Sequence, residues 1–204
     1  MAIAYVGGAT ATTGTGTATT LTVTYSSGAN TLYMAFAAFL PSGTSITSIT
    51  DSASNAWTFT NLLGSFYVAW TNSNAITPVT SVVIHASSAT NICAVLGEYS
   101  GVTTVAVGAA TAVTSATTPA SLTKTITANN WLISAQGCQT SNALTTMSSS
   151  TGNMRNFATM TLSAGYGFAG VALTDNTSAT TSVTTATAFT QTYLTAVSAG
   201  EEAH

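Results

Sequence analysis

Apolar and polar residues alternate along much of the chain with a period of two, which is typical of β-strands. The clearest example is 19–25, where Leu21, Val23 and Tyr25 are expected to face a core and the intervening threonines to face solvent. The segment Leu32–Leu40 is almost wholly apolar, which predicts a central strand covered on both faces, with a buried helix as the alternative. No segment shows a sustained period of 3.6 residues with helix caps.

Further strands are predicted between turns rich in Gly, Asn and Ser. Ala56–Leu62 and Ser65–Thr71 are expected to form a hairpin with a tight turn near Gly64, and Val79–Ala86 and Ile92–Tyr99 a second hairpin. The remaining predicted strands are Ser45–Thr50, Thr111–Thr114, Ser121–Thr127, Trp131–Gly137, Asn156–Leu162, Tyr166–Thr174, Ser182–Thr185 and Ala188–Val197.

About a dozen short strands at this spacing are the signature of a sandwich or a barrel. We therefore predict an all-β fold, a single antiparallel β-sandwich of jelly-roll-like form with little or no helix. The domain is expected to cover residues 1–197, and residues 198–204 to form a mobile tail. A length of 204 residues suffices for a sizeable core without disulfide or metal.

Composition changes the picture chiefly through charge. Only 3% of the residues are charged, against roughly a quarter in an average protein, while 46% are hydrophobic. Two basic residues, Lys124 and Arg155, cannot neutralise a run of phosphates, so nucleic-acid binding is excluded. The mean hydropathy of +0.39 and the net charge of −3 indicate a folded chain rather than a disordered one.

Signals for targeting and redox chemistry are weak. The N-terminal residues have neither a basic region nor a continuous apolar run, so no Sec signal peptide is visible. Release by lysis is the expected route out of the cell, with a non-classical secretion system as the alternative. The chain has no apolar run of about 18 residues, so membrane insertion is not predicted. Cys93 and Cys138 have no metal-type spacing and are expected to be buried and unpaired, with a disulfide as the alternative.

The strongest local motif is 49–58, ITDSASNAWT. Asp51 and Asn55 are placed to accept and donate hydrogen bonds in an Asx-type loop, after which Trp57 returns to the core. The alternative is a calcium-binding or sugar-binding loop. Calcium takes six to eight oxygen ligands, and Asp51 is the only carboxylate nearby.

Glu98 and Lys124 are two charged residues expected inside strands. Glu98 follows apolar residues and is interpreted as a buried hydrogen-bond anchor, although half of a hydrolase carboxylate pair is the alternative. Lys124 lies on the same face as Leu122 and Ile126, so it needs an acidic partner or a route to water. We predict that Glu98 is that partner; an isopeptide cross-link is the sharper alternative.

The sequence gives little support for a serine hydrolase site or a sugar-binding platform. His85 is expected on a solvent face or an edge, and the Gly-x-Ser-x-Gly elbow of a serine hydrolase is absent. Trp57, Trp70 and Trp131 are expected to pack in the core, with a sugar-stacking platform as the alternative. No catalytic residue, cofactor or metal ligand is predicted.

Three segments carry a resemblance to a known group of domains. Residues 51–58 (DSASNAWT), 66–70 (FYVAW) and 94–102 (AVLGEYSGV) resemble, in order, a Thr/Ala/Gly-rich β-sandwich domain of phage structural proteins and bacterial extracellular proteins. The resemblance implies a jelly-roll or immunoglobulin-like sandwich and an exterior location, and it implies no reaction. Ser54 stands where that group often has glycine.

The expected function is therefore structural and non-enzymatic, as a subunit of a virion or extracellular assembly such as a capsid decoration, a head fibre or a tail-associated protein. Its expected partners are copies of itself or other proteins of the virion or surface assembly. The alternative is a carbohydrate-binding adhesin module, motivated by the aromatic, hydroxyl and amide side chains, with glycans as partners.

Overall fold

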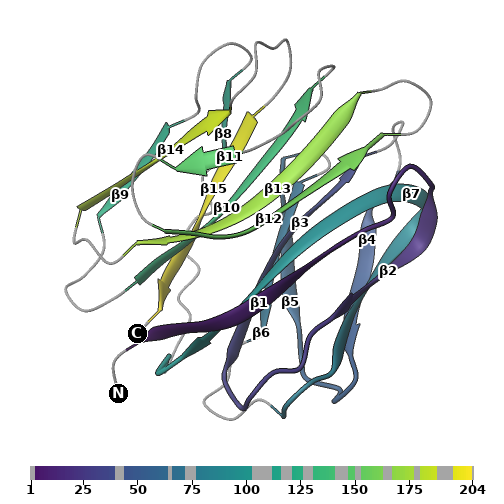
Figure 1. Cartoon of the computed structure of the whole chain (residues 1–204), viewed down its shortest axis with the longest axis horizontal. Helices are drawn as coiled ribbons and strands as arrows, with labels where there is room; N and C mark the ends of the chain where they lie inside the picture. Colours follow the sequence, from purple (N-terminus) through teal and green to yellow (C-terminus); the bar gives the residue numbers. More distant parts are fainter. Residues whose placement is uncertain are drawn as a thin grey trace.

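Strands alone form the regular structure of the described residues in the computed structural model, and none of these residues is helical (Figure 1). The structure describes residues 3–39, 44–63, 66–71, 77–102, 112–115, 121–125, 131–140, 147–149, 153–162, 167–176, 180–187 and 195–203. Side chains are described for 3–30, 44–61, 66–71, 77–102, 131–133, 137, 153–162, 167 and 169–175. The prediction of an all-β chain with antiparallel sheets is confirmed.

The strands follow one another along the chain with these bounds: β1 Ala4–Thr12, β2 Ala18–Thr24, β3 Thr31–Phe39, β4 Ile46–Asp51, β5 Thr58–Leu63, β6 Phe66–Thr71, β7 Ser81–Ser100, β8 Ala112–Ser115, β9 Ser121–Thr125, β10 Trp131–Thr140, β11 Met147–Ser149, β12 Asn153–Thr161, β13 Phe168–Asn176, β14 Thr180–Thr187 and β15 Thr195–Ala203. β2 and the β5–β6 hairpin match their predicted positions closely.

Every pairing within the sheets is antiparallel. The first sheet has seven strands, ordered β1-β7-β3-β6-β5, with β2 and β4 also paired to β7. The second has five strands, ordered β12-β13-β10-β15-β8, and the third has three, ordered β11-β14-β9. In Figure 1 the seven-stranded and five-stranded sheets occupy the two halves of the molecule.

β7 is one strand of 20 residues, so the predicted hairpin between Val79–Ala86 and Ile92–Tyr99 is wrong. Its first part pairs with β2 and β4, and its second part pairs with β1 and β3. Pairing with β2 jumps from His85 to Thr90, which marks a local irregularity between the two parts. A tight hairpin needs residues with positive φ, and none occurs between 86 and 91. The chain therefore passes through 86–91 without reversing direction, as part of one strand.

Two apolar cores lie on the two faces of β6 and the second part of β7. Phe66, Val68 and Trp70 belong to the first core, with Val171 and Leu173 of the five-stranded sheet. The alternate residues of β6 and β7 belong to the second core, with residues of β2, β4 and the first part of β7; they are Tyr67, Ala69, Ile92, Ala94 and Leu96. This alternation follows from the period of two in a strand, and it explains why β6 is buried at every position.

Glycine allows the layers to approach at two places. A Cβ atom on Gly97 of β7 would overlap Leu173 of the facing sheet. A Cβ atom on Gly8 of β1 would overlap the Leu96 carbonyl oxygen and the Asn156 side chain. β1 was not predicted, because Gly7 and Gly8 weaken a strand pattern, yet the close approach requires glycine at Gly8.

The C-terminal region also differs from expectation. Residues 198–203, assigned from the sequence to a mobile tail, lie within β15 and pair with β8 and β10. The predicted strand Ala188–Val197 overlaps the start of β15 (Thr195–Ala203), and its residues 188–194 lie outside the described residues. The alternation of Thr and Ala in this region gave no signal for where the strand begins or ends.

Candidate functional site

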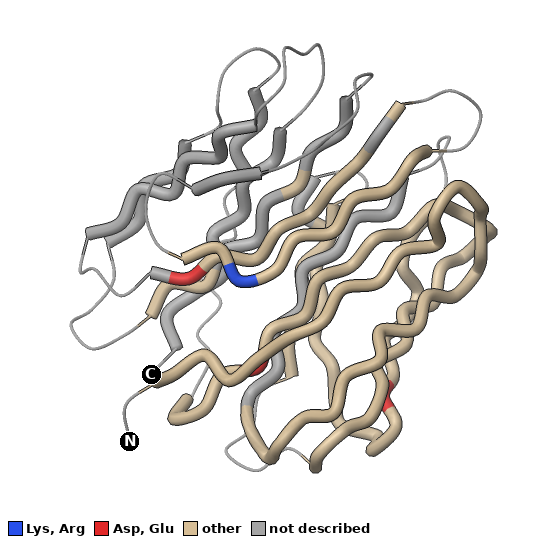
Figure 2. Tube along the Cα trace, viewed as in Figure 1, with Lys and Arg blue, Asp and Glu red and all other residues tan. Residues whose placement is uncertain are grey.

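Charged residues are few and scattered over the described chain (Figure 2). Of the acids whose side chains are described, Glu98 and Asp175 are buried and Asp51 is half-buried. Each accepts hydrogen bonds from other parts of the chain, as described below. The search for a site therefore begins with these three carboxylates.

Asp51 organises the loop between β4 and β5. Its Oδ1 accepts hydrogen bonds from the backbone amides of Ala53 at 2.9 Å and Asn55 at 3.1 Å. Its Oδ2 accepts from the Asn55 side-chain amide at 3.1 Å and from the Trp57 indole at 2.8 Å. The Asn55 side-chain nitrogen in turn donates to the Thr77 carbonyl oxygen, and its side-chain oxygen accepts from the Thr77 backbone amide. The Asx-type loop predicted from Asp51, Asn55 and Trp57 is present.

This arrangement suits a structural anchor better than a calcium ligand. A carboxylate has about four lone-pair positions, and four N–H donors point at Asp51. Within the described ranges, no group of three or more His, Cys, Asp or Glu residues is placed to hold a metal ion. The loop therefore uses its carboxylate to fix Trp57 and the segment around Thr77.

Acid is expected to weaken this loop. Burial raises the pKa of the Asp51 carboxyl, but the hydrogen bonds from Trp57, Asn55 and Ala53 lower it more, so its pKa lies below the ordinary value. The stability that Asp51 contributes is therefore complete above the ordinary pKa of about 3.9 and is lost as the pH falls through the lower folded value. Asp51→Asn should cost about 2 kcal/mol at neutral pH and less in acid. Urea unfolding across a pH series measures this difference. A cost that stays constant with pH would contradict a role for the ionised Asp51 carboxylate.

Ser54 has a φ of 59°, in the left-handed region that favours glycine. This conformation costs an L-residue about 1–2 kcal/mol, whereas glycine costs about 0.5–1 kcal/mol in chain entropy. Ser54→Gly should therefore raise the free energy of unfolding by roughly 0.5 kcal/mol. Thermal unfolding measures the change, and Ser54→Ala, which keeps the Cβ atom, should show no gain. Equal gains in both variants would mean that the backbone is not the cause.

Glu98 anchors the connection between β2 and β3. Its carboxylate accepts hydrogen bonds from the Tyr25 hydroxyl at 2.7 Å, from the Gly28 amide at 2.8 Å and from the Asn30 side chain. Burial first, and then the bond and charge of Glu98, raise the pKa of Tyr25. Only 1% of Glu98 is exposed, so the predicted role of buried anchor fits its surroundings.

The predicted pairing of Lys124 with Glu98 stays a prediction. Lys124 lies in β9, where its backbone pairs with Thr181, and its side chain falls outside the described residues. β9 belongs to the three-stranded sheet and Glu98 to the seven-stranded sheet. Three donors already occupy the Glu98 carboxylate, which leaves room for one more at most.

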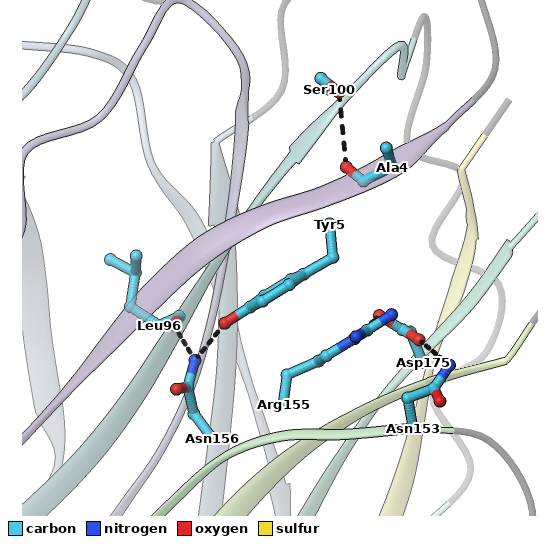
Figure 3. Close-up of polar contacts among 8 residues, drawn as sticks. All are labelled: Ala4, Tyr5, Leu96, Ser100, Asn153, Arg155, Asn156 and Asp175. Atoms are coloured by element: carbon cyan, nitrogen blue, oxygen red, sulfur yellow. Dashed lines mark hydrogen bonds and ion pairs between the residues drawn. The ribbon is translucent and has the colours of Figure 1, made fainter.

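A third polar cluster joins β1 to β12 and β13, and Figure 3 shows it in close-up. The Arg155 Nε donates to the Asp175 Oδ2 at 2.6 Å, and the Arg155 guanidinium lies 4.6 Å from the centre of the Tyr5 ring. The Asn153 amide donates to the Asp175 Oδ1 at 3.3 Å. The Asn156 amide donates to the Tyr5 hydroxyl at 3.1 Å and to the Leu96 carbonyl at 2.7 Å.

Irregular pairing in two strands positions this cluster. β12 shifts its register against β13 between Met154 and Asn156, which places Arg155 at a bulge. β1 shifts its register against β7 between Tyr5 and Gly7, and Val6 at that bulge is 51% exposed. Bulges redirect side chains, and here they accompany the stacking of Arg155 on Tyr5.

Tyr99 lies beside the same cluster in the first core. Its ring packs edge-on against Tyr5 and Trp131, at centroid distances of 5.5 and 6.3 Å. Burial, and next the charge of Asp175, raise the pKa of the Tyr99 hydroxyl. Among the described residues that hydroxyl has no partner in hydrogen-bonding geometry. The charge of Asp175 therefore raises the pKa of this hydroxyl more than hydrogen bonding to Asp175 does.

The hydrolase alternative requires two carboxylates around one substrate. Glu98 and Tyr99 are consecutive in β7, so their side chains point to opposite faces of the sheet. Glu98 contacts Tyr25 on one face, while Tyr99 packs in the first core on the other, near Asp175. Glu98 and Asp175 thus lie on opposite sides of β7.

The other residues considered from the sequence are the tryptophans, His85 and the cysteines. Trp70 is buried in the first core, Trp131 is half-buried against it, and Trp57 is half-buried against the second. His85 is half-buried, and its Nε2 lies 2.9 Å from the Thr50 hydroxyl. Cys93 is buried as predicted, while the side chain of Cys138 lies outside the described residues.

Arg155, Asp175, Tyr5 and Asn156 were not singled out from the sequence as a cluster. The available signal was scarcity, because a chain with two basic residues has few ways to compensate a buried acid.

No protein-family model matches the chain, and no characterised protein or solved structure shows significant similarity to it. None of the described residues forms a helix long and apolar enough to cross a membrane.

Proposed function

We propose that the chain is a non-enzymatic structural subunit of a virion or extracellular assembly, folded as a jelly-roll-like β-sandwich. The observation that carries the proposal is where the charges lie. Asp51, Glu98 and Asp175 each accept hydrogen bonds from the chain itself, and Arg155 pairs with Asp175. Carboxylates used in this way hold the fold together and are poorly placed to bind a substrate.

The outer face of the β2–β7–β4 layer supports contact between neutral surfaces. Leu21 and Val23 of β2 are buried, while the alternating threonines Thr20, Thr22 and Thr24 are exposed. Thr20 pairs with His85 of β7, and Thr22 pairs with Val83. This face carries hydroxyl and methyl groups without charge, so it lacks the repulsion that keeps most protein surfaces apart.

Open strand edges give a second means of contact. β1 and β5 stand at the two ends of the path through the seven-stranded sheet, and neither strand contains Lys or Pro. Natural proteins commonly use these residues to block pairing at an edge. A subunit whose edges are left open can bind another copy by backbone hydrogen bonds, with specificity from shape.

The resemblance to the Thr/Ala/Gly-rich domains of phage and bacterial extracellular proteins adds the exterior location. It rests on residues 51–58, 66–70 and 94–102. Asp51, Asn55 and Trp57 in the first of these segments form the loop described above, and Glu98 in the third is the buried anchor. The shared residues therefore serve the fold, which is consistent with a group of domains defined by architecture.

The proposal is tested on the purified chain in three assays: turnover of glycan, peptide and ester substrates, sedimentation over a wide concentration range, and binding to a glycan array. We expect no turnover, concentration-dependent self-association and no glycan binding. Contacts between copies should bury on the order of 1,000 Å² or more. A strict monomer that binds a glycan would overturn the proposal in favour of the adhesin module.

A further inference from the structure

β2 is an edge strand in the half of the molecule opposite the five-stranded sheet (Figure 1). Among the described strands it pairs with β7 alone. The hydrogen bond from the Tyr25 amide to the Thr80 carbonyl, 3.1 Å long, fixes which residues turn toward β7. In an antiparallel pair, successive residues direct their N–H and C=O groups to opposite sides of the strand. The backbone groups of Thr20, Thr22 and Thr24 therefore point to the edge away from β7.

This edge of β2 has the properties of an edge that is open to pairing. The side chains of Thr20, Thr22 and Thr24 are exposed, while Leu21 and Val23 between them are buried. β2 contains neither Pro nor a charged residue, and its register against β7 is regular from Thr20 to Thr24. Edges without a bulge, a Pro or a charge are the ones that another chain can extend.

The other edge strands of the seven-stranded sheet are better protected. Each has an extra residue in its own strand, because its register shifts against the neighbouring strand. The shifts lie between Tyr5 and Gly7 in β1, between Ile46 and Ser48 in β4, and between Asn61 and Leu63 in β5. Bulges of this kind twist an edge away from a potential partner. In this sheet β2 is therefore the edge most suited to pairing.

The sequence of β2 matches a second copy of itself. In a two-fold dimer, if residue i contacts residue j, then j contacts i. With the axis at Thr22, the two copies of Thr22 lie opposite each other and Thr20 lies opposite Thr24. Leu21 then lies opposite Val23. This register keeps the threonines of both copies on the outer face and the buried residues on the core face, whereas a slip by one residue would mix them.

Backbone hydrogen bonds fit the same register. The three residues that point to the open edge are the three that meet in it, as two pairs of Thr20 with Thr24 and one pair of Thr22 with Thr22. Each such pair exchanges two N–H···O=C bonds, and threonines opposite each other add side-chain contact. We propose that β2 pairs with β2 of a second copy about this axis, so that the layers of β4, β7 and β2 in two subunits form one continuous sheet.

Charge favours a second copy as the occupant of this edge. The one carboxylate in β2, β4 and the first part of β7 is Asp51, which is bound to Trp57. A partner of ordinary composition would bring charged side chains to a surface that holds no opposite charge for them, and β2 of a second copy brings none. This inference rests on the proposed function, since it names the surface by which subunits would meet. Association should change little with salt concentration, because no ion pair contributes.

The first test places a blocking residue at the centre of the edge and measures dimer dissociation constants by analytical ultracentrifugation. Thr22→Lys brings like charges together at the axis and should weaken association at least about tenfold. Thr22→Pro removes an N–H that points away from β7, so it should have a similar effect and spare the fold. Thr10→Lys is the matched control, because Thr10 is an exposed threonine of β1, and it should leave the constant unchanged.

Folding is checked separately by circular dichroism and thermal unfolding at a concentration where the parent is monomeric. Thr22→Lys and Thr10→Lys should have the parent's spectrum and a similar thermal midpoint, since both side chains are exposed. If Thr22→Pro lowers the midpoint, Thr22→Lys decides the test alone. Association that Thr10→Lys abolishes and Thr22→Lys leaves intact would place the contact on β1 and overturn the inference.

The second test reads the register by disulfide formation under mild oxidation. Thr22→Cys should give a covalent dimer, because the two copies of this position lie about 5.5 Å apart between Cα atoms, within the range for a disulfide. Thr20→Cys and Thr24→Cys should each stay uncross-linked, since like positions lie about 14 Å apart along the strands. The double variant Thr20→Cys/Thr24→Cys should cross-link between copies. The parent, which keeps Cys93 and Cys138, gives the background.

The outcomes separate the inference from the proposed function. If the parent associates, and Thr22→Lys associates equally well, the inference fails and the structural role stands. If Thr20→Cys alone cross-links efficiently and Thr22→Cys does not, the axis at Thr22 is wrong. If the parent stays monomeric at all concentrations, both the inference and the proposed function fail.

Discussion

Replacing Gly8 with alanine is expected to cost about 3 kcal/mol or more of folding stability. An added Cβ atom would overlap the Leu96 carbonyl oxygen of the neighbouring strand and the Asn156 side-chain amide. The carbonyl belongs to backbone and cannot move without disturbing the pairing of β1 with β7. The Asn156 amide bonds the same carbonyl and the Tyr5 hydroxyl, so the substitution also disturbs the link between the sheets.

Urea unfolding of Gly8→Ala beside Gly16→Ala measures this effect. Gly16 is a matched control, because the nearest atom to a Cβ there is the Thr13 carbonyl oxygen at 3.7 Å, an ordinary contact. Gly16→Ala should change stability by less than about 0.5 kcal/mol. Coincident unfolding midpoints for the two variants would show that β1 does not approach β7 and β12 as described.

Glu98→Ala is expected to cost about 3 kcal/mol, the second of the two largest effects. The substitution leaves the Tyr25 hydroxyl, the Gly28 amide and the Asn30 amide without their common acceptor. Donors that lose their partner away from water cost more than the net value of each hydrogen bond. The connection between β2 and β3 would lose its main attachment to β7.

Two milder variants identify the cause. Tyr25→Phe removes one of the three donors and should cost about 1 kcal/mol. Glu98→Gln keeps a carbonyl oxygen for Gly28 and Asn30 and should fall between Tyr25→Phe and Glu98→Ala. If Glu98→Gln is as unstable as Glu98→Ala, the ionic charge of Glu98 stabilises the fold more than its acceptor geometry does.

The sequence was informative wherever local patterning determines structure. The alternation around Leu21 and Val23 predicted both the strand and its buried face, and both are confirmed. The motif from Asp51 to Trp57 is also local, since all its hydrogen bonds to Asp51 lie within six residues. The spacing of the donors along the chain is therefore visible without knowing the fold.

Features set by distant partners could not be predicted in this way. The apolar residues on both sides of Ser87 are consistent with either a hairpin or one long strand, and the partners decide between them. Those partners are β2 and β4 for the first part of β7, and β1 and β3 for the second.

The Arg155–Asp175 pair likewise depends on a bulge in β12, and no pattern of residues in the sequence predicts that bulge. The charge inventory gave the one usable signal for this pair. A chain that keeps five acids and two bases among 204 residues places each of them under strong constraint. Glu98 was recognised as an anchor on that ground, and its donors turned out to be neutral. Pairing Asp175 with Arg155 by the same reasoning would have required knowing that β12 and β13 are neighbours.

The position of β7 has a consequence for how the chain matures during synthesis. Among the strands that the structure describes, β1, β2 and β4 pair with β7 alone, and the last residue of β7 is Ser100. A ribosome adds about 5–20 residues per second, so β1 waits several seconds between its own emergence and that of its partner. During that interval these strands expose uncharged backbone edges to other nascent chains. Slowing translation between Asp51 and Ser81 should therefore lower the soluble yield, and chaperones that shield extended segments should restore it.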